Sequence, residues 1–506
     1  MPDPRPATYY LETFGCQMNV LDSELVAGQL RALGLRPVAS ASEADVVLFN
    51  TCSVRQHAED KVLSRLGQLK SLKRRRPETV VGVIGCMAER QKQALFVSVP
   101  HLDLLCGPGE LHRLPDLLRE VWDGHARVAA LAGSQSRRTD VLARALEDDS
   151  LEALDLARGP GAGQTPWQAY VRVQRGCDKF CTYCVVPFTR GPERSRPAAN
   201  IVAEAQTLIE RGCREITLLG QTVNSYVHQE NGRPVHFAEL LRRVHDLPGL
   251  DRLRFVTSFP ADWDDDIFRA MRDCPRICPY LHIPAQSGSD RILKAMKRGY
   301  TTAEYLRLMD RAREYVPHIA LAGDFIVGFP GETESDFQAT IALVRRVEYK
   351  SIFVFKYSPR PGTAADRSQV DAVPVDVKAR RNNELLEVQS AVSLRHKQAL
   401  IGQTVEVLVE GYSKMARRPR GGDDHANPLP DSEQARGSEA ALAGSDQLVG
   451  RTPQDLIAVF AGDAAHIGAL VNVRVLAVSA LTLFGRIESV VAPPRTTTLP
   501  LRAVTE

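Results

Sequence analysis

Three cysteines close together in the middle of the chain are its most informative chemical feature. Cys177, Cys181 and Cys184 follow the spacing CxxxCxxC, so one loop can bring three thiols onto one small object. A closed zinc site usually takes four ligands from two separated pairs, and the next cysteine, Cys213, lies well downstream. Three thiolates suit a 4Fe–4S cluster with one iron left open for a substrate or cofactor. The spacing disfavours the alternatives, a structural zinc loop or three unrelated core cysteines.

A second set of cysteines follows three separate apolar runs near the N-terminus. Cys16, Cys52 and Cys86 each come directly after such a run. The carboxyl ends of parallel strands form the ligand crevice of an open α/β sheet, so these thiols are expected to meet there. We therefore predict a second iron–sulfur cluster with three protein ligands. Cys106 also follows a strand and is a possible fourth ligand, although a fourth thiolate would close the open position.

The elements that position the second set are predicted from hydrophobic periodicity. Over residues 7–124, short apolar strands alternate with amphipathic helices, which predicts an α/β domain with a doubly wound parallel sheet. The predicted strands are 9–14, 45–50, 80–85 and 102–105, and the predicted helices include 21–33 and 59–73. Residues 125–162 form a polar linker with one helix expected at 141–156.

The CxxxCxxC loop belongs to a second region, residues 163–395. Six strand-like runs, each followed by a helical pattern, predict a partial (βα)6 barrel whose site lies at the carboxyl ends of its strands. The runs begin near Ala169, Glu215, Leu253, Tyr280, Ile319 and Ser351. Polar clusters follow several of these runs. Each one alone could be a helix cap, whereas together they favour a ligand rim.

The C-terminal part is predicted to be a small β-barrel. A long helix at 375–400 leads into residues 396–490, with strands at 404–410, 456–460, 470–477 and 481–489. Residues 417–447 interrupt this module without periodicity and are predicted to be a disordered insertion. Lys414, Arg451 and Arg474 are candidates for a basic face on this module.

Composition places limits on the class of protein. The net charge of +3 is too small to indicate nucleic-acid binding by itself. No secretory signal or membrane-spanning run is present, and ten clustered cysteines do not indicate a disulfide framework, so we expect a cytoplasmic protein. The basic run at 70–76 either contacts phosphates or places cations at a helix end.

The chain resembles a known family. CxxxCxxC with Tyr183 before its last cysteine resembles the radical S-adenosylmethionine (SAM) enzymes. The order of strand-end cysteines, radical core and small β module resembles the radical SAM methylthiotransferases, whose last part is an RNA-binding TRAM barrel. The runs TFGCQMN at 13–19, NTCSVR at 50–55, LHRLP at 111–115 and FCTYCVVPFTRG at 180–191 are similar to the MiaB branch.

The resemblance implies a reaction and a set of ligands. In the MiaB branch, a methylthio group is added to C2 of N6-isopentenyladenosine next to the anticodon of tRNA. It implies two 4Fe–4S clusters. Cys177, Cys181 and Cys184 would hold the one that cleaves SAM, and Cys16, Cys52 and Cys86 an auxiliary cluster that carries the sulfur. It also implies an electron donor such as flavodoxin or ferredoxin, and a monomer is expected.

The resemblance also points to residues of the SAM pocket. These are Tyr183, Arg196, Gln221, Asn224, Ser258 and Gln286. Arg196 could pair bidentately with a carboxylate, and its alternative is a surface arginine beside a proline turn. Two sibling branches, which modify threonylcarbamoyladenosine in tRNA or an aspartate of a ribosomal protein, remain alternatives. A non-catalytic iron–sulfur RNA-binding protein is a further alternative from a different class.

Overall fold

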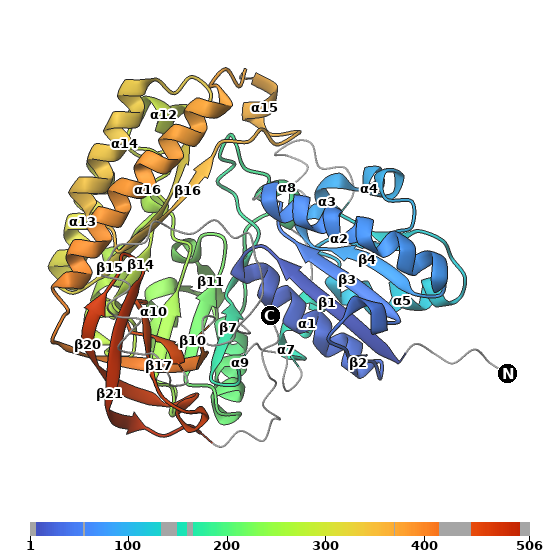
Figure 1. Ribbon diagram of the computed structural model, residues 1–506, viewed down its shortest axis with the longest axis horizontal. Helices are drawn as coiled ribbons and strands as arrows, with labels where there is room; N and C mark the ends of the chain where they lie inside the picture. The colour runs from blue at the N-terminus through green and yellow to red at the C-terminus, as the bar shows by residue number, and fades with distance from the viewer. Residues whose placement is uncertain are drawn as a thin grey trace, which may run out of the picture.

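The N-terminal part of the chain forms a six-stranded sheet in the computed structural model, which describes residues 7–53, 56–132, 149–158, 165–368, 370–413 and 447–495 (Figure 1). The order is β2-β1-β3-β4-β5-β6, and all neighbours are parallel. The strands are β1 (Thr8–Phe14), β2 (Arg36–Pro37), β3 (Val46–Thr51), β4 (Val80–Ile84), β5 (Leu104–Cys106) and β6 (Val128–Ala130). The four predicted strands are confirmed, whereas β2 and β6 were not predicted, and β6 carries the sheet beyond residue 124.

Helices cover both faces of this sheet, as expected for a doubly wound fold. Val46 and Leu48 of β3 face one core with α1 (Gln17–Ala32) and α5 (Leu114–Trp122). Val47 and Phe49 face the opposite core, which is closed by the remaining helices. Those helices are α2 (Gln56–Arg75), α3 (Cys86–Gln91) and α4 (Gln93–Ser98). The alternation follows from the two-residue period of a strand, and β3 is buried at every position because both faces are covered.

The connecting region contributes one described helix, α7 (Asp149–Leu156). It coincides with the end of the helix predicted at 141–156, whose earlier residues lie outside the described part of the chain. The basic run at 70–76 ends α2, and two of its cations are held by the protein. Lys73 pairs with Asp103 at 2.6 Å and Arg76 with Asp45 at 2.7 Å. These pairs favour the helix-end interpretation over phosphate binding.

The central part is an open barrel of six parallel strands. They form two three-stranded sheets, β7-β10-β13 and β14-β15-β16, which meet where Ser258 N donates to His282 O at 3.3 Å. The strands are β7 (Gln168–Arg172), β10 (Glu215–Leu219), β13 (Arg252–Phe255), β14 (Tyr280–His282), β15 (Ala320–Val327) and β16 (Ser351–Lys356). Each begins within one residue of its predicted position, so the partial (βα)6 barrel is confirmed.

Helices surround the outer face of the barrel strands (Figure 1). The longer ones are α9 (Ala198–Glu210), α10 (Phe237–His245), α11 (Asp265–Asp273), α13 (Thr302–Tyr315), α14 (Glu334–Val347) and α16 (Val375–Gln398). The short elements are β8 (Gln174–Arg175), α8 (Val186–Arg190), β9 (Arg194–Ser195), β11 (Val227–Glu230), β12 (Arg233–His236), α12 (Asp290–Ala295) and α15 (Ala364–Ser368).

The C-terminal module is a closed barrel in the order β17-β18-β19-β21-β20. Its strands are β17 (Thr404–Tyr412), β18 (Gln447–Arg451), β19 (Ile457–Ala461), β20 (Leu470–Val478) and β21 (Thr482–Ala492). Four strands were predicted, and β18 was not. The predicted insertion at 417–447 lies outside the described residues except for Gln447, which is the first residue of β18, so its predicted end was wrong by one residue.

The C-terminal module packs against the amino-terminal ends of the central strands. Arg254 of β13 donates to Thr452 O at 2.7 Å and to Pro453 O at 2.9 Å. Lys350, directly before β16, pairs with Asp455 at 2.6 Å. The carboxyl ends of the strands, where a barrel of this type carries its site, are therefore left to the N-terminal domain and the connecting loops.

Candidate active site

The N-terminal cysteines follow three neighbouring strands. Cys16 caps α1 after β1, Cys52 follows β3, and Cys86 begins α3 after β4. Because β1, β3 and β4 are adjacent in the sheet, the thiols lie at one edge. A hydrogen bond with Cys52 lowers the pKa of Cys16 to about 6, whereas burial raises the pKa of Cys86. The structure therefore places Cys16 and Cys52 close together at this edge.

A buried amide network holds these strand ends together. The Cys16 thiol donates to Asn19 Oδ1 at 3.1 Å, and Asn19 Nδ2 donates to Asn50 Oδ1 at 2.9 Å. Gly85 completes the arrangement with a φ of +88°, and a Cβ there would lie 2.4 Å from Asn50 Oδ1. Only glycine fits this position without strain, so the backbone before Cys86 is set by close packing.

Cys106 occupies a different environment. It ends β5, is fully buried in the core beneath α1 and α5, and donates to Glu110 O at 3.3 Å. Burial raises the pKa of its thiol. A buried thiol that donates to the main chain of its own loop is explained as a core residue. This favours Cys16, Cys52 and Cys86 as the three ligands of the N-terminal cluster, without Cys106.

The CxxxCxxC loop leaves the first barrel strand through β8. Cys177 is buried, and Cys181 and Cys184 are half-buried. Cys184 Sγ accepts from Val186 N at 3.4 Å, and Cys181 Sγ accepts from Arg298 Nη1 at 3.3 Å. Burial, together with the nearby Cys181, raises the pKa of Cys184 to about 12. A cation bound between these thiols would favour their ionised forms.

Gly176 makes a close-packed turn directly before Cys177. Its φ is +66°, and a Cβ would lie 1.8 Å from Pro192 O. Replacing Gly176 with alanine is expected to cost about 1–2 kcal/mol for the left-handed backbone and a further ~1–3 kcal/mol for overpacking. Chemical unfolding of Gly176→Ala, with iron content, tests this. Gly191→Ala is the matched control, because its φ is +78° with no atom within 4 Å of the added Cβ, so only the backbone cost is expected. Equal stability losses in the two variants would contradict the clash.

The two cysteine sets lie on either side of one domain boundary. The short helix α8 follows Cys184 and packs against α3, which begins with Cys86. Its last residue, Arg190, pairs with Asp22 of α1 at 2.7 Å. The loop that carries one cysteine set therefore contacts the domain that carries the other.

The donor sets consist of thiols, which are the usual ligands of iron–sulfur clusters. Across the described ranges, no three His, Cys, Asp or Glu side chains converge tightly enough to hold one metal ion. The thiolates of a cluster bind different irons, so they stand farther apart than the ligands of one ion. Three thiols in each set leave one iron of a 4Fe–4S cluster open. Their assignment as ligands stays a prediction.

Two of the predicted SAM-pocket residues present unpaired polar atoms at the barrel rim. Ser258 and Gln286 follow β13 and β14, and both are buried. Within the described residues, Ser258 Oγ and Gln286 Oε1 have no hydrogen-bond partner. Thr257 and Gln286 also adopt positive φ values of 70° and 68°. Buried unsatisfied groups and strained backbone occur together where a ligand completes a site, so these residues fit the predicted pocket.

Tyr183 and Gln221 also lie near this rim. Tyr183 packs edge to face on Phe329, with ring centroids 6.4 Å apart. Gln221 is half-buried directly after Gly220, at the end of β10. Asn224 is buried and holds the next loop in place, because its side chain both donates to Phe259 O at 2.8 Å and accepts from Phe259 N at 2.7 Å. Its amide shapes the rim, and its role toward SAM stays a prediction.

Arg196 lies in a buried ion-pair cluster. It is 1% exposed, so the alternative of a surface arginine was wrong. Its Nε donates to Glu152 at 2.8 Å, and its Nη1 donates to Glu204 at 2.8 Å and to Arg172 O at 2.6 Å. Every nitrogen of this guanidinium is engaged, since Nη2 also donates to Glu152. We therefore leave Arg196 out of the proposed pocket.

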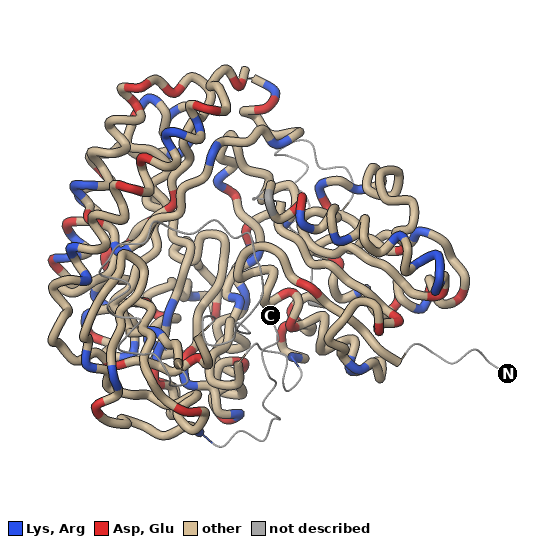
Figure 2. The backbone as a smooth tube through the Cα atoms, viewed as in Figure 1, with Lys and Arg blue, Asp and Glu red and all other residues tan. Residues whose placement is uncertain are grey.

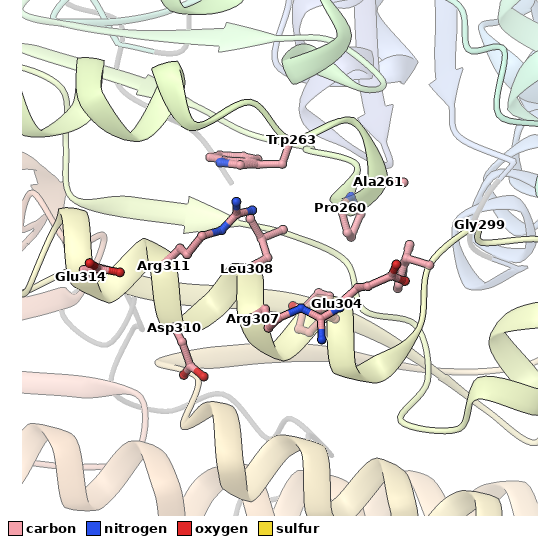
Figure 3. Close-up of a pocket in the computed structure, with 12 residues that line it drawn as sticks. Pro260, Ala261, Trp263, Gly299, Glu304, Arg307, Leu308, Asp310, Arg311 and Glu314 are labelled. Carbon is pink, nitrogen blue, oxygen red and sulfur yellow. The ribbon is translucent and has the colours of Figure 1, made fainter.

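One well-formed cavity lies away from both cysteine sets. It has a volume of about 580 Å³ and lies between the segment 260–263 and helix α13. Figure 3 shows Trp263 facing Arg311 across it, with Arg307 and Glu304 on the helix side. No cysteine of either set and no predicted SAM residue lines this cavity. It is a feature of the barrel's outer layer and not of the site.

Sequence reasoning missed the charged residues that lie near the cysteines. Arg298 contacts Cys181, and Arg190, which pairs with Asp22, ends the helix that packs beside Cys86. All three charged residues are nearly fully buried, and each lies far along the chain from at least one partner. The only sequence signal for Arg190 was its position within the motif at 180–191. No sequence signal pointed to Arg298, because 117 residues of chain separate it from Cys181.

A partial barrel with a CxxxCxxC loop after its first strand defines a radical SAM protein, here with a second cysteine-bearing α/β domain. A family profile described as "Radical SAM superfamily" matches residues 171–344, and one described as "Uncharacterized protein family UPF0004" matches residues 8–107. A radical SAM methyltransferase, TsrM from Kitasatospora setae, matches with a TM-score of 0.50 and 16% identity over 71% of this chain and 75% of that one. This likeness concerns the fold.

Two relatives specify the family. The chain is 47% identical to a tRNA-2-methylthio-N(6)-dimethylallyladenosine synthase of Rhodopirellula baltica, over 96% of both chains. It is 41% identical to the protein of that name from Carboxydothermus hydrogenoformans, over 92% of this chain and 96% of the relative. The chain belongs to the family of tRNA-2-methylthio-N(6)-dimethylallyladenosine synthases.

Proposed function

We propose that the protein adds a methylthio group to C2 of N6-isopentenyladenosine next to the anticodon of tRNA. The observation that carries this proposal is the meeting of two three-cysteine sets at one domain boundary, in a chain whose relatives carry that name. When bound, two 4Fe–4S clusters and SAM supply the radical and the sulfur that this reaction needs. The names of the relatives favour this reaction over the two sibling reactions and over a non-catalytic protein.

The chain's own residues would position these groups. Cys177, Cys181 and Cys184 would hold one cluster at the barrel rim, beside the unpaired Ser258 Oγ and Gln286 Oε1 that would bind SAM. Cys16, Cys52 and Cys86 would hold the other across the boundary. A C2–H bond of adenine is not acidic enough for a protein base, so both clusters must reach the same bound base, and proximity supplies the selectivity.

Nucleoside mass spectrometry of tRNA tests the proposed reaction directly. A strain that lacks this protein is expected to accumulate N6-isopentenyladenosine and to contain no 2-methylthio derivative, and the intact gene should restore it. If the derivative persists with no second such enzyme present, the proposal is wrong. Accumulation of unmodified threonylcarbamoyladenosine instead would indicate a sibling reaction.

We infer a tRNA contact on the outer face of the C-terminal barrel. Arg474 and Arg486 are exposed cross-strand neighbours on β20 and β21. Arg474 is held only loosely, with Nε 4.0 Å from Glu488 Oε1. Like charges directly opposite destabilise a sheet, so such a pair suits a polyanionic partner. Of the other candidates, Arg451 is held by Asp455 at 2.9 Å and Glu410 at 3.3 Å, and Lys414 lies outside the described residues. Elsewhere basic and acidic residues are interspersed (Figure 2).

Replacing both exposed arginines with alanine should weaken tRNA binding. Each lost phosphate contact is expected to lower the slope of log K against log salt by about 1, so the double variant should lose about 2. Electrophoretic mobility shifts over a salt series measure this. Arg272→Ala on α11 is the control, because this exposed arginine belongs to the central barrel, where it pairs with its neighbour Asp273 and lies over the Tyr315 ring. Unchanged slope in the double variant would place the tRNA contact elsewhere.

The remaining expectations concern the cellular setting. No helix in the described ranges is long and apolar enough to cross a bilayer. We propose that the protein works in the cytoplasm, as a monomer, and that a small electron-transfer protein such as flavodoxin or ferredoxin reduces it. Size-exclusion chromatography with light scattering tests the oligomeric state, and reduction of the anaerobic protein by each donor tests the partner.

A further inference from the structure

We propose that two buried arginines, Arg190 and Arg298, act as separate charge partners of the two cysteine sets and raise the reduction potential of the cluster each set holds. Arg190 would serve the N-terminal set and Arg298 the CxxxCxxC set. The inference rests on the cluster assignments of the proposed function but not on the identity of the substrate.

Arg190 reaches across the domain boundary to the N-terminal thiols. Its side chain is 7% exposed, and Nη2 pairs with Asp22 Oδ2 at 2.7 Å. Helix α8, which ends in Arg190, packs against α3, whose first residue is Cys86. The guanidinium therefore lies close enough to the N-terminal thiols for its charge to act on Cys86 and Cys16. Helix α8 thus delivers a fixed positive charge from the CxxxCxxC side to thiols of the other domain.

Arg298 occupies the corresponding position for the CxxxCxxC set. Its Nη1 donates to Cys181 Sγ at 3.3 Å, Nε to the Tyr300 hydroxyl at 3.1 Å and Nη2 to Pro284 O at 3.1 Å. Its charge also lies over the Phe259 ring at 4.5 Å. No carboxylate is among these partners, so Cys181 is the anionic group that this cation faces once a cluster is bound.

The direction of the effect follows from electrostatics. Adding an electron makes a cluster more negative, and a fixed cation beside its thiolates stabilises that product. Hydrogen bonds to the sulfurs and the local charge are established determinants of cluster potential, and burial limits screening by water and salt. Removing either guanidinium should therefore make its own cluster harder to reduce and leave the distant one nearly unchanged.

The test is a redox titration of the anaerobically reconstituted full chain, followed by electron paramagnetic resonance. The cluster whose signal changes on addition of SAM is the CxxxCxxC cluster, which separates the two signals. Arg190→Gln should lower the N-terminal potential by about 59 mV or more, a tenfold change for one electron. Arg298→Gln should lower the other potential by a similar amount. Each variant is the control for the other.

Comparing Arg190→Gln with Arg190→Lys separates the effect of the positive charge from the effect of side-chain packing. Arg190→Gln leaves Asp22 paired with Arg172 at 2.5 Å, so the buried carboxylate keeps a partner. Arg190→Lys keeps the charge and should restore most of the potential. Loss of N-terminal iron in Arg190→Gln but not in Arg190→Lys would also support the charge role. Unchanged potentials with full iron, equal shifts of both clusters, or equal iron loss in the glutamine and lysine variants would overturn the proposal. None of these outcomes depends on whether tRNA is methylthiolated.

Discussion

Replacing Cys177, Cys181 or Cys184 with alanine is expected to abolish reductive cleavage of SAM. Each thiol supplies one iron ligand, and a cluster held by two thiolates is exposed to loss or oxidation. The N-terminal set follows strands of a separate six-stranded sheet, so its cluster should remain. Anaerobic assay of 5′-deoxyadenosine after chemical reduction measures the cleavage, and iron and sulfide analysis should show loss of about half the iron.

The control for this result is another buried cysteine of the same barrel. Cys274 ends α11 and packs in the central core, with no role in either set. Cys274→Ala should keep SAM cleavage and full iron content. Retained cleavage in all three CxxxCxxC variants would contradict the assignment of this loop.

Replacing Cys16, Cys52 and Cys86 together should have the opposite effect. SAM cleavage is expected to persist, since the barrel rim and its loop are intact, but methylthio product should fall to background because the donated sulfur has no site. Both are measured in one reaction, by chromatography of 5′-deoxyadenosine and of digested tRNA. Methylthio product from the triple variant would rule out the auxiliary cluster.

Cys106 supplies the matched control for the triple variant. Serine can replace its thiol as a donor to Glu110 O, so Cys106→Ser should fold. Full iron content, about eight irons with two clusters, is expected. Loss of about half would make Cys106 a ligand and the three-ligand interpretation wrong.

The sequence by itself determined the order and class of the main elements. Apolar runs predicted all six barrel strands, and a strand such as β10, which is buried at every position, leaves a continuous hydrophobic signal. The strands missed were β2, β6, β8 and β9, which have two or three residues each, the hairpin of β11 and β12, and β18, which follows an aperiodic segment. Short edge strands carry little apolar pattern, since their pairing depends on a neighbour that already exists.

For the site, the spacing of the six cysteines was sufficient to predict two groups and the type of object each could hold. Only the tertiary structure decided which charged groups face them. Arg196 was expected to bind a ligand, but it is neutralised by Glu152 and Glu204. Arg190 and Arg298 carried no expected role, yet Arg298 contacts the Cys181 thiol and Arg190 ends the helix that packs against α3, which begins with Cys86. Local periodicity records burial along one element, whereas an ion pair depends on two segments brought together by packing of the whole chain.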